Sequence, residues 1–208
     1  DSFDQMIANR LEPEIYSFRS LADFADAVSH AGETRYPVHI KLDTGMHRLG
    51  FMEGELDMLT ETLGETPSVK VATIFSHLNC SDMPQEDRYT REQIARFDRM
   101  SGRLAAALPY PVLRHTANSA AIERFPEAQF DMCRLGLGLY GFGFEHNDEL
   151  KPVSTLKSRI VQLKHLSAGE AVGYGRAGKL TRDSVTATVP MGYADGLDRH
   201  LGCGRGSM

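Results

Sequence analysis

The fold class that the sequence predicts is α/β: a partial (β/α)8 TIM-type barrel followed by the beginning of an all-β domain. Strand-like runs alternate with amphipathic helical segments at intervals of roughly 20–40 residues, which is typical of parallel βα units. From about residue 153 the pattern changes to strands without helices. The strands before that point, about five, are too few for a closed barrel of about 250 residues. We therefore assign residues 1–148 to the C-terminal portion of a βα barrel and residues 149–208 to the N-terminal portion of a β domain.

The barrel portion is expected to begin with a strand at 14–18 and a helix that follows it. Ser20 is expected to cap this helix, and Gly32 stands where the helix should end. A strand is predicted over 38–44, because its apolar residues alternate with polar ones. Leucines at helical spacing then predict a second helix that Gly64 ends.

The later elements follow from the same two periodicities. They are strands at 70–76, 112–115 and 132–141, helices at about 85–107 and at 120–125 after an Asn118 cap, and, in the β domain, strands at 157–166 and 185–189.

Composition excludes several classes of function. The 208 residues carry 23 Lys and Arg against 28 Asp and Glu, a net charge of −5, so neither nucleic acid nor a membrane is expected as a partner. No apolar run approaches the ~18 residues of a membrane span. The opening DSFDQMIANR lacks the features of a signal peptide, which predicts a cytoplasmic location. Three scattered cysteines, Cys80, Cys133 and Cys203, do not make a disulfide framework.

Two kinds of motif are weak. The stretches 136–141 and 173–178 fit the Gly-x-Gly-x-x-Gly fingerprint, but neither precedes a helix signal, so we expect no nucleotide site. A metal site has the candidate ligands His47, His77, Cys80 and Asp82. Nothing supplies a second ligand pair at a familiar spacing, so we expect a polar cluster with no metal.

Polar residues gather where the predicted strands end, and chemistry collects at that edge of βα folds. Asp43 to Arg48, His77, the pair Asn118 and Ser119, and Arg134 arise there from separate strands. Asn118 and Ser119 also open a helix, so their N–H groups favour a phosphate. The residues alone therefore predict an anion-binding site in a barrel.

Six longer motifs occur along the chain, within a resemblance that extends from about residue 14 to residue 199. They are HIKLDTGMHRLGF (39–51), FSHLNCSD (75–82), HTANSAA (115–121), DMCRLGLGLYG (131–141), AVGYG (171–175) and MGYADG (191–196). In this order they resemble the successive motifs of bacterial alanine racemases. The resemblance implies a pyridoxal 5'-phosphate (PLP) barrel of fold type III, followed by a β domain, in a head-to-tail homodimer.

The resemblance also implies roles for individual residues. Tyr174 matches a catalytic base that reaches into the partner's site, and Arg134 matches the arginine that faces the pyridine nitrogen of the cofactor. Arg48 matches the arginine near the phenolic oxygen and the substrate carboxylate, while His77 matches the histidine beside Arg134. Lys41 matches a lysine that is often carbamylated and steadies Arg48. Ser119, Gly136 and Leu137 match residues that bind the phosphate, and Asn118 joins them because it also lies at the helix start. Tyr193 matches a tyrosine at the inner mouth of the substrate corridor. Asp82 and Arg199 match residues farther out in that corridor.

Each of these assignments has a plainer alternative. Tyr174 could be a buried tyrosine of a β domain, and Lys41 could be an ordinary lysine in a polar barrel interior. Asp82 and Arg199 could be exposed surface charges.

The chemistry of racemisation supports the matched roles. One proton must leave one face of Cα and another must arrive on the opposite face, which two bases can do. Tyrosine needs its phenol pKa lowered from about 10 to serve as one of them. Arg134 cannot give up its proton, so it disfavours a protonated pyridine. The less delocalised carbanion is then quickly reprotonated, which favours racemisation over transamination.

The expected function is the PLP-dependent interconversion of L- and D-alanine, which supplies D-alanine for the bacterial cell wall. The family's Schiff-base lysine segment and its C-terminal motifs do not occur in the sequence, so we expect the central part of a longer protein, inactive by itself. One alternative is a broad-specificity amino-acid racemase of the same fold type. Another is a non-catalytic PLP-binding module, against which Tyr174 argues because a cofactor carrier needs no second base.

Overall fold

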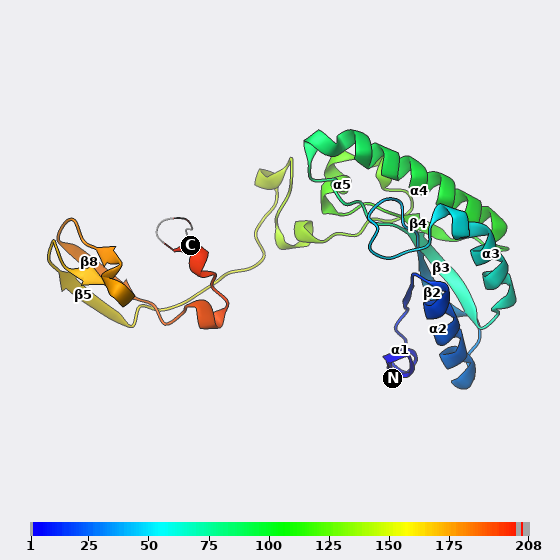
Figure 1. The fold of residues 1–208 in the computed structure, drawn as a ribbon, viewed down its shortest axis with the longest axis horizontal. Coiled ribbons are helices and arrows are strands. Elements are labelled where there is room, and N and C mark those ends of the chain that lie inside the picture. The colour runs from blue at the N-terminus through cyan, green and yellow to red at the C-terminus, as the bar shows by residue number, and fades with distance from the viewer. Residues whose placement is uncertain (1, 203–204, 206–208) are drawn as a thin grey trace. The chain divides into compact units, whose positions relative to one another are not determined.

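The computed structural model describes residues 2–202 and 205, and the chain divides into two compact units (Figure 1). The first unit is Asp1–Val153 and the second is Ser154–Met208. The domain boundary inferred from the sequence, between residues 148 and 149, stays a prediction.

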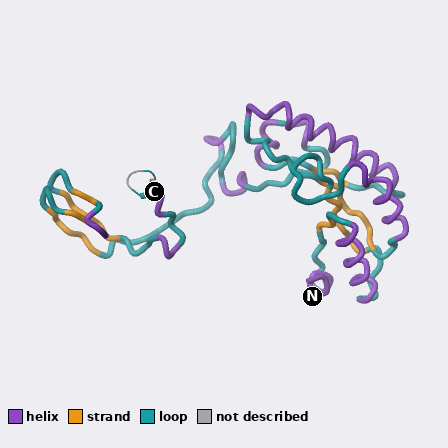
Figure 2. Tube along the Cα trace, viewed as in Figure 1, coloured by secondary structure: helices purple, strands orange, loops and turns teal. Residues whose placement is uncertain are grey.

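The first unit is built on a parallel sheet of four strands in the order β1-β2-β3-β4. The strands are β1 (Glu14–Ile15), β2 (Tyr36–Lys41), β3 (Val69–Phe75) and β4 (Leu113–His115). The helices are α1 (Ser2–Ala8), α2 (Phe18–His30), α3 (Leu56–Glu65), α4 (Asp87–Ala107) and α5 (Ser119–Arg124). Strands and helices alternate along this unit (Figure 2), which confirms the predicted α/β class.

The ends of α2 show how the sequence sets a helix boundary. Ser17, not Ser20, is the N-cap, so the prediction was wrong by three residues. Ser17 Oγ accepts the N–H of Ser20 and Ser20 Oγ accepts the N–H of Ser17, both at 3.1 Å, which forms a reciprocal capping box. The predicted end is confirmed. Gly32 has a φ of +73°, and its N–H and that of the next residue donate to carbonyls of the last turn at 3.1 Å.

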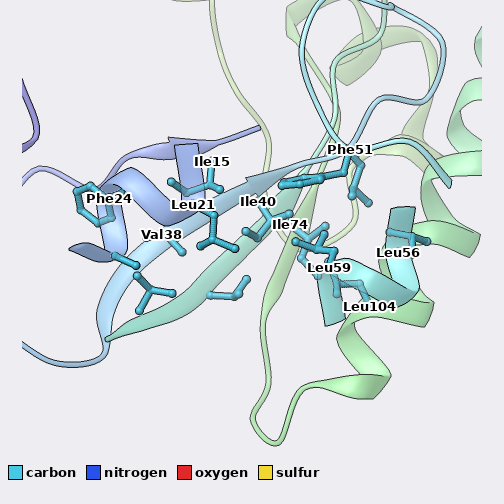
Figure 3. Close-up of a cluster of buried hydrophobic side chains, with 14 of the residues drawn as sticks. Ile15, Leu21, Phe24, Val38, Ile40, Phe51, Leu56, Leu59, Ile74 and Leu104 are labelled. Carbon is cyan, nitrogen blue, oxygen red and sulfur yellow. The ribbon is translucent and has the colours of Figure 1, made fainter. Parts of the chain in front are cut away.

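The hydrophobic core lies between one face of the sheet and the helices α2, α3 and α4 (Figure 3). Val38 and Ile40 on β2 and Ile74 on β3 are fully buried on this face. The helices contribute Leu21, Phe24 and Val28 from α2, Leu56 and Leu59 from α3, and Phe97, Met100 and Leu104 from α4. The periodicities that predicted these elements therefore mark the side chains that hold the sheet in place.

The opposite face of the sheet carries polar side chains at the alternate positions. His39 and Lys41 on β2 lie beside Thr73 and Phe75 on β3, and Phe75 lies beside His115 on β4. Lys41, Thr73 and His115 are buried. We call this the interior face, since it points away from the helices.

Two further expectations for the first unit were wrong. Residues 132–141, predicted as a strand, form an irregular segment that ends in a 3₁₀ turn at Leu137–Tyr140. Leu135, Leu137 and Leu139, whose spacing suggested the strand, are 55–60% exposed. Gly64 does not end its helix, because α3 continues to Glu65.

The second unit contains two antiparallel strand pairs. Strand β5 (Gln162–Leu166) pairs with β8 (Ser184–Thr188), and β6 (Ala171–Val172) pairs with β7 (Gly178–Lys179). The predicted strand at 157–166 is therefore shorter than expected. Cys80 and Cys133 are free thiols, and Cys203 lies outside the described residues. None of the helices in the described part of the chain has the length and apolar character needed to cross a membrane.

A carboxylate joins the end of the first unit to α5. Glu123 accepts the N–H groups of Phe144, Glu145 and His146 at 2.7–3.1 Å. Burial tends to raise the pKa of Glu123, but these hydrogen bonds outweigh it and lower the pKa below its usual value of 4.5. The charged form is thus favoured by folding.

Glu123→Gln is expected to lower the free energy of unfolding by about 1–2 kcal/mol at pH 7, because an amide keeps one acceptor oxygen and loses the charge. Since folding depresses the pKa, this contribution is present above about pH 4.5 and is lost as the pH falls further. Urea unfolding at pH 7 and pH 3 measures it, with the exposed Glu61→Gln as the matched control. An equal loss at both pH values would contradict the assignment.

Candidate active site

A pocket of about 410 Å³ lies at the carboxyl ends of the strands of the first unit. Most of the residues predicted to act together line it: His77, Asp82, Asn118, Ser119, Arg134, Gly136 and Leu137. A larger cavity, about 720 Å³, lies where α2, α3 and α4 end. We place the site in the smaller pocket, because the convergent polar groups are there.

Arg134 is held by acceptors that carry no charge. Its Nη2 donates to the carbonyl oxygens of Ser76 at 2.6 Å and Thr116 at 3.2 Å, and its Nη1 donates to Nδ1 of His115. No ion pair to a carboxylate occurs for Arg134 within the described residues. Burial lowers the pKa of Arg134 below its usual range, yet arginine stays protonated at neutral pH. The pocket therefore contains a fixed positive charge with no protein counterion.

Two histidines lie beside that guanidinium. His77 Nδ1 is 3.4 Å from Arg134 Nη2, as the sequence predicted, but His115 makes the closer contact. Burial, followed by the charges of Arg134, Arg48 and Lys41, lowers the pKa of His77 below 6.5. Burial and the charge of Arg134 lower the pKa of His115 to about 4. Both rings are therefore neutral at pH 7.

The start of α5 presents hydrogen-bond donors to the pocket. Asn118 is the N-cap: its Oδ1 accepts the N–H of Ala121 at 3.0 Å and the hydroxyl of Ser81 at 2.8 Å. Ser119 Oγ accepts the N–H groups of Gly136 at 2.8 Å and Gly138 at 3.2 Å, so its own hydrogen stays available. The side chain of Asn118 thus builds the helix start, and Ser119 joins it to the 136–138 segment.

Arg48 lies on the loop that follows β2, and the loop is held from several sides. Asp43 Oδ1 accepts the N–H groups of Gly45 at 2.9 Å and His47 at 3.0 Å. Gly45 has a φ of +136°, and a Cβ there would lie 2.4 Å from the hydroxyl of Tyr89. Glycine is therefore required at this close approach. Arg48 itself is exposed.

Lys41 does not contact Arg48 in the described residues. Its Nζ forms an ion pair with Glu14 Oε1 at 3.0 Å and lies 5.4 Å from the centre of the Phe75 ring. Lys41 is nevertheless buried on the interior face, as expected for a lysine inside a barrel. The carbamylation inferred from the resemblance stays a prediction.

The remaining predicted residues belong to the second unit. Tyr174 stands between β6 and β7 and its side chain is fully exposed, which is not the burial of a core tyrosine. Gly173 and Gly175 on either side of it have φ values of +84° and +63°, so the turn presents the phenol outward. The guanidinium of Arg199 lies 5.5 Å from the centre of the Tyr193 ring.

Sequence reasoning missed the residues of the interior face that lie behind Arg134. These residues are His115, Thr73 and His39, and all three lie within predicted strands. A polar residue at every second position of a strand usually indicates a face exposed to solvent, so they were not taken as site residues. One general rule could have identified them: the strands of a parallel sheet are buried on both faces, so their polar side chains are buried too and need partners.

Profiles of two protein families match the chain. "Alanine racemase, N-terminal domain" matches residues 1–143, and "Alanine racemase, C-terminal domain" matches residues 153–208. The chain belongs to the alanine racemase family. The resemblance inferred from the six motifs is thereby confirmed.

Individual relatives agree with this assignment. An alanine racemase of Sorangium cellulosum is 38% identical over 203 residues, which are 97% of this chain and 53% of the relative. Alanine racemase 1 of Clostridium acetobutylicum is 35% identical over 208 residues, 95% of this chain and 52% of the relative. The chain thus spans about half the length of the curated relatives it matches, consistent with the expected central part of a longer alanine racemase.

Solved alanine racemases have the same fold. The enzyme from D-cycloserine-producing Streptomyces lavendulae has a TM-score of 0.87 at 29% identity, covering 96% of this chain and 54% of its own. The enzyme from Bartonella henselae, solved with covalently bound pyridoxal phosphate, has a TM-score of 0.76 at 27% identity, covering 97% and 55%. The predicted partial barrel followed by the start of a β domain is confirmed.

Proposed function

We propose that the protein carrying this chain is a PLP-dependent alanine racemase that interconverts L- and D-alanine by a two-base mechanism. The observation that carries the proposal is the setting of Arg134, a partly buried guanidinium bound by carbonyl oxygens and a neutral imidazole. A PLP enzyme that protonates the pyridine nitrogen needs a carboxylate at that position, and an arginine does the opposite.

The donor set of the pocket fits PLP. Ser119 can donate its hydroxyl hydrogen to a phosphate oxygen, and the first N–H groups of α5 have no partner within the helix. Gly136 and Leu137 line the same side of the pocket. These residues would hold the phosphate, with Arg134 at the pyridine nitrogen and His77 beside the ring.

The chain's own groups then divide the work of racemisation. When bound, PLP supplies an electron sink that makes the Cα proton of alanine acidic. Arg134 donates hydrogen bonds and keeps its protons, so the pyridine nitrogen stays unprotonated and negative charge remains at Cα. Arg48 binds the substrate carboxylate, for which its exposed side chain on a braced loop is suited.

Tyr174 acts as one base, and the exposed turn that presents it supports this role. We propose a homodimer in which Tyr174 of one protomer serves the pocket of its partner, so that both copies are needed for one site. Tyr193, Asp82 and Arg199 line the substrate corridor. The product, D-alanine, supplies the bacterial cell wall, and the enzyme acts in the cytoplasm.

Initial rates on L-alanine, L-serine and L-lysine separate alanine racemase from its closest rival. We expect kcat/KM for L-alanine to exceed that for the other two by at least about tenfold, since each added group is worth ~1–3 kcal/mol in a fitted pocket. The measurement is the D-enantiomer formed by the full-length protein that carries this chain, in the presence of PLP. Comparable rates on all three would favour a broad-specificity racemase, and no D-product would favour a PLP-binding module.

A further inference from the structure

A continuous chain of hydrogen bonds crosses the interior face of the sheet and ends at Arg134. Glu12 Oε2 lies 2.9 Å from His39 Nε2, and His39 Nδ1 lies 2.8 Å from Thr73 Oγ1. Thr73 Oγ1 lies 3.0 Å from His115 Nε2, and His115 Nδ1 contacts Arg134 Nη1. We call these five residues the interior hydrogen-bond chain.

The two ends set the direction of the bonds that they make, because arginine only donates and a carboxylate only accepts. Arginine has only donors, so Nδ1 of His115 must accept and its hydrogen must lie on Nε2. That hydrogen is donated to Thr73, whose own hydroxyl hydrogen is then free for Nδ1 of His39. At the other end, Nε2 of His39 donates to the carboxylate of Glu12, which only accepts.

Burial makes this arrangement restrictive. Thr73 and His115 are each 4% exposed, and the His115 ring is stacked on Phe75 with the centroids 5.1 Å apart. The ring of His115 is neutral, because burial and Arg134 depress its pKa to about 4. A buried neutral imidazole needs an acceptor for its N–H, and Thr73 is the group that provides one.

The interior hydrogen-bond chain holds the part of the Arg134 guanidinium that the carbonyl oxygens of Ser76 and Thr116 do not hold. The oxygens of Ser76 and Thr116 hold Nη2, whereas Nη1 depends on His115, by its ring nitrogen and by a longer contact of 3.4 Å to its carbonyl. If His115 turned its other tautomer toward Arg134, two donors would face each other at short range. Loss of the acceptor at Thr73 would leave the Nε2 hydrogen of His115 without a partner, so a ring turned away from Arg134, with its hydrogen on Nδ1, would become competitive.

We propose that Thr73 and His39 are positioning residues that, together with Glu12, keep His115 in the tautomer that accepts a hydrogen bond from Arg134. They thereby fix the guanidinium that faces the cofactor's pyridine nitrogen. This inference rests on the proposed function for its catalytic consequence. The positioning of Arg134 itself does not depend on PLP.

The first test measures the His115 tautomer by ¹⁵N NMR of the protein labelled in its histidines, with and without PLP, using His115→Gln to assign the signals. The wild-type protein is expected to show an unprotonated Nδ1 and a protonated Nε2 on His115. Thr73→Val removes the acceptor at nearly constant volume and should give a mixture of tautomers, whereas Thr73→Ser should restore the wild-type pattern. A wild-type pattern in a folded Thr73→Val protein overturns the proposal.

The second test measures pyruvate formed per D-alanine formed. Thr73→Val should raise this ratio several-fold, and Thr73→Ser should leave it unchanged, with thermal unfolding confirming that each variant is folded. A rise that serine does not rescue means a purely structural role and contradicts the proposal. If Thr73→Val does not fold, His39→Leu replaces it, because the side chain of His39 is partly exposed. That variant is expected to show a smaller shift in the His115 tautomer and a smaller rise in the ratio of pyruvate to D-alanine.

The two tests keep the inference and the proposed function apart. A wild-type protein with the expected tautomer but no racemase activity contradicts the proposed function alone. An active racemase whose His115 carries its hydrogen on Nδ1 contradicts the inference alone.

Discussion

Tyr174→Phe is expected to lower kcat for alanine racemisation by about 10²–10⁴-fold, the usual contribution of a general acid–base group. The phenol oxygen is the only atom removed, and it is fully exposed at the turn between β6 and β7. The stability of the protein should therefore stay within about 0.5 kcal/mol of wild type. Polarimetry of L- and D-alanine measures the rate.

A matched control for this variant is Tyr140→Phe, because Tyr140 is also exposed and lies outside the pocket. That change should leave the rate unaltered. A two-base mechanism adds a sharper expectation, since only one enantiomer depends on Tyr174 for removal of its proton. In D₂O the variant should still exchange the Cα proton of the other enantiomer, and equal loss of exchange for both would contradict the assigned role.

Arg134→Glu is expected to lower racemisation by about 10²–10³-fold, the range seen when a preorganised electrostatic group is removed. It should also raise pyruvate formation relative to D-alanine. A carboxyl group beside the pyridine nitrogen favours protonation of that nitrogen. Negative charge would then spread away from Cα into the ring. Chiral chromatography and a pyruvate assay on the same sample give the ratio.

Arg134→Lys is the matched comparison, because lysine keeps the charge but cannot donate to Ser76, Thr116 and His115 in the same fork geometry. It should slow racemisation with little change in the product ratio. If the glutamate variant formed the two products in the wild-type ratio, the proposed role of Arg134 would be wrong.

The sequence predicted the sheet and its covering helices because burial imposes a period on each element. Val38 and Ile40 alternate on β2 and face the helices, and the leucines of α3 follow helical spacing. The segment 132–141 shows the limit of that reasoning. Its leucines alternate, but a strand exists only when a neighbour pairs with its backbone, and periodicity says nothing of the neighbour.

The site was predictable to the extent that it follows from topology. Parallel strands end at a common edge, so His77, Ser119 and Arg134 could be expected together, and one pocket contains all three. The interior hydrogen-bond chain was not predictable, because its partners lie up to 42 positions apart and meet only through the register of β2, β3 and β4. Local sequence carries no record of that register.

The fate of L-alanine incubated in D₂O with PLP and the full-length protein that carries this chain shows whether that protein is a racemase. Proton NMR follows the loss of the Cα proton, and chiral analysis follows the enantiomers. The account predicts D-alanine carrying deuterium at Cα, which accumulates until both enantiomers are present in equal amounts, with little pyruvate. Pyruvate as the main product, or Cα exchange without any D-alanine, would contradict it.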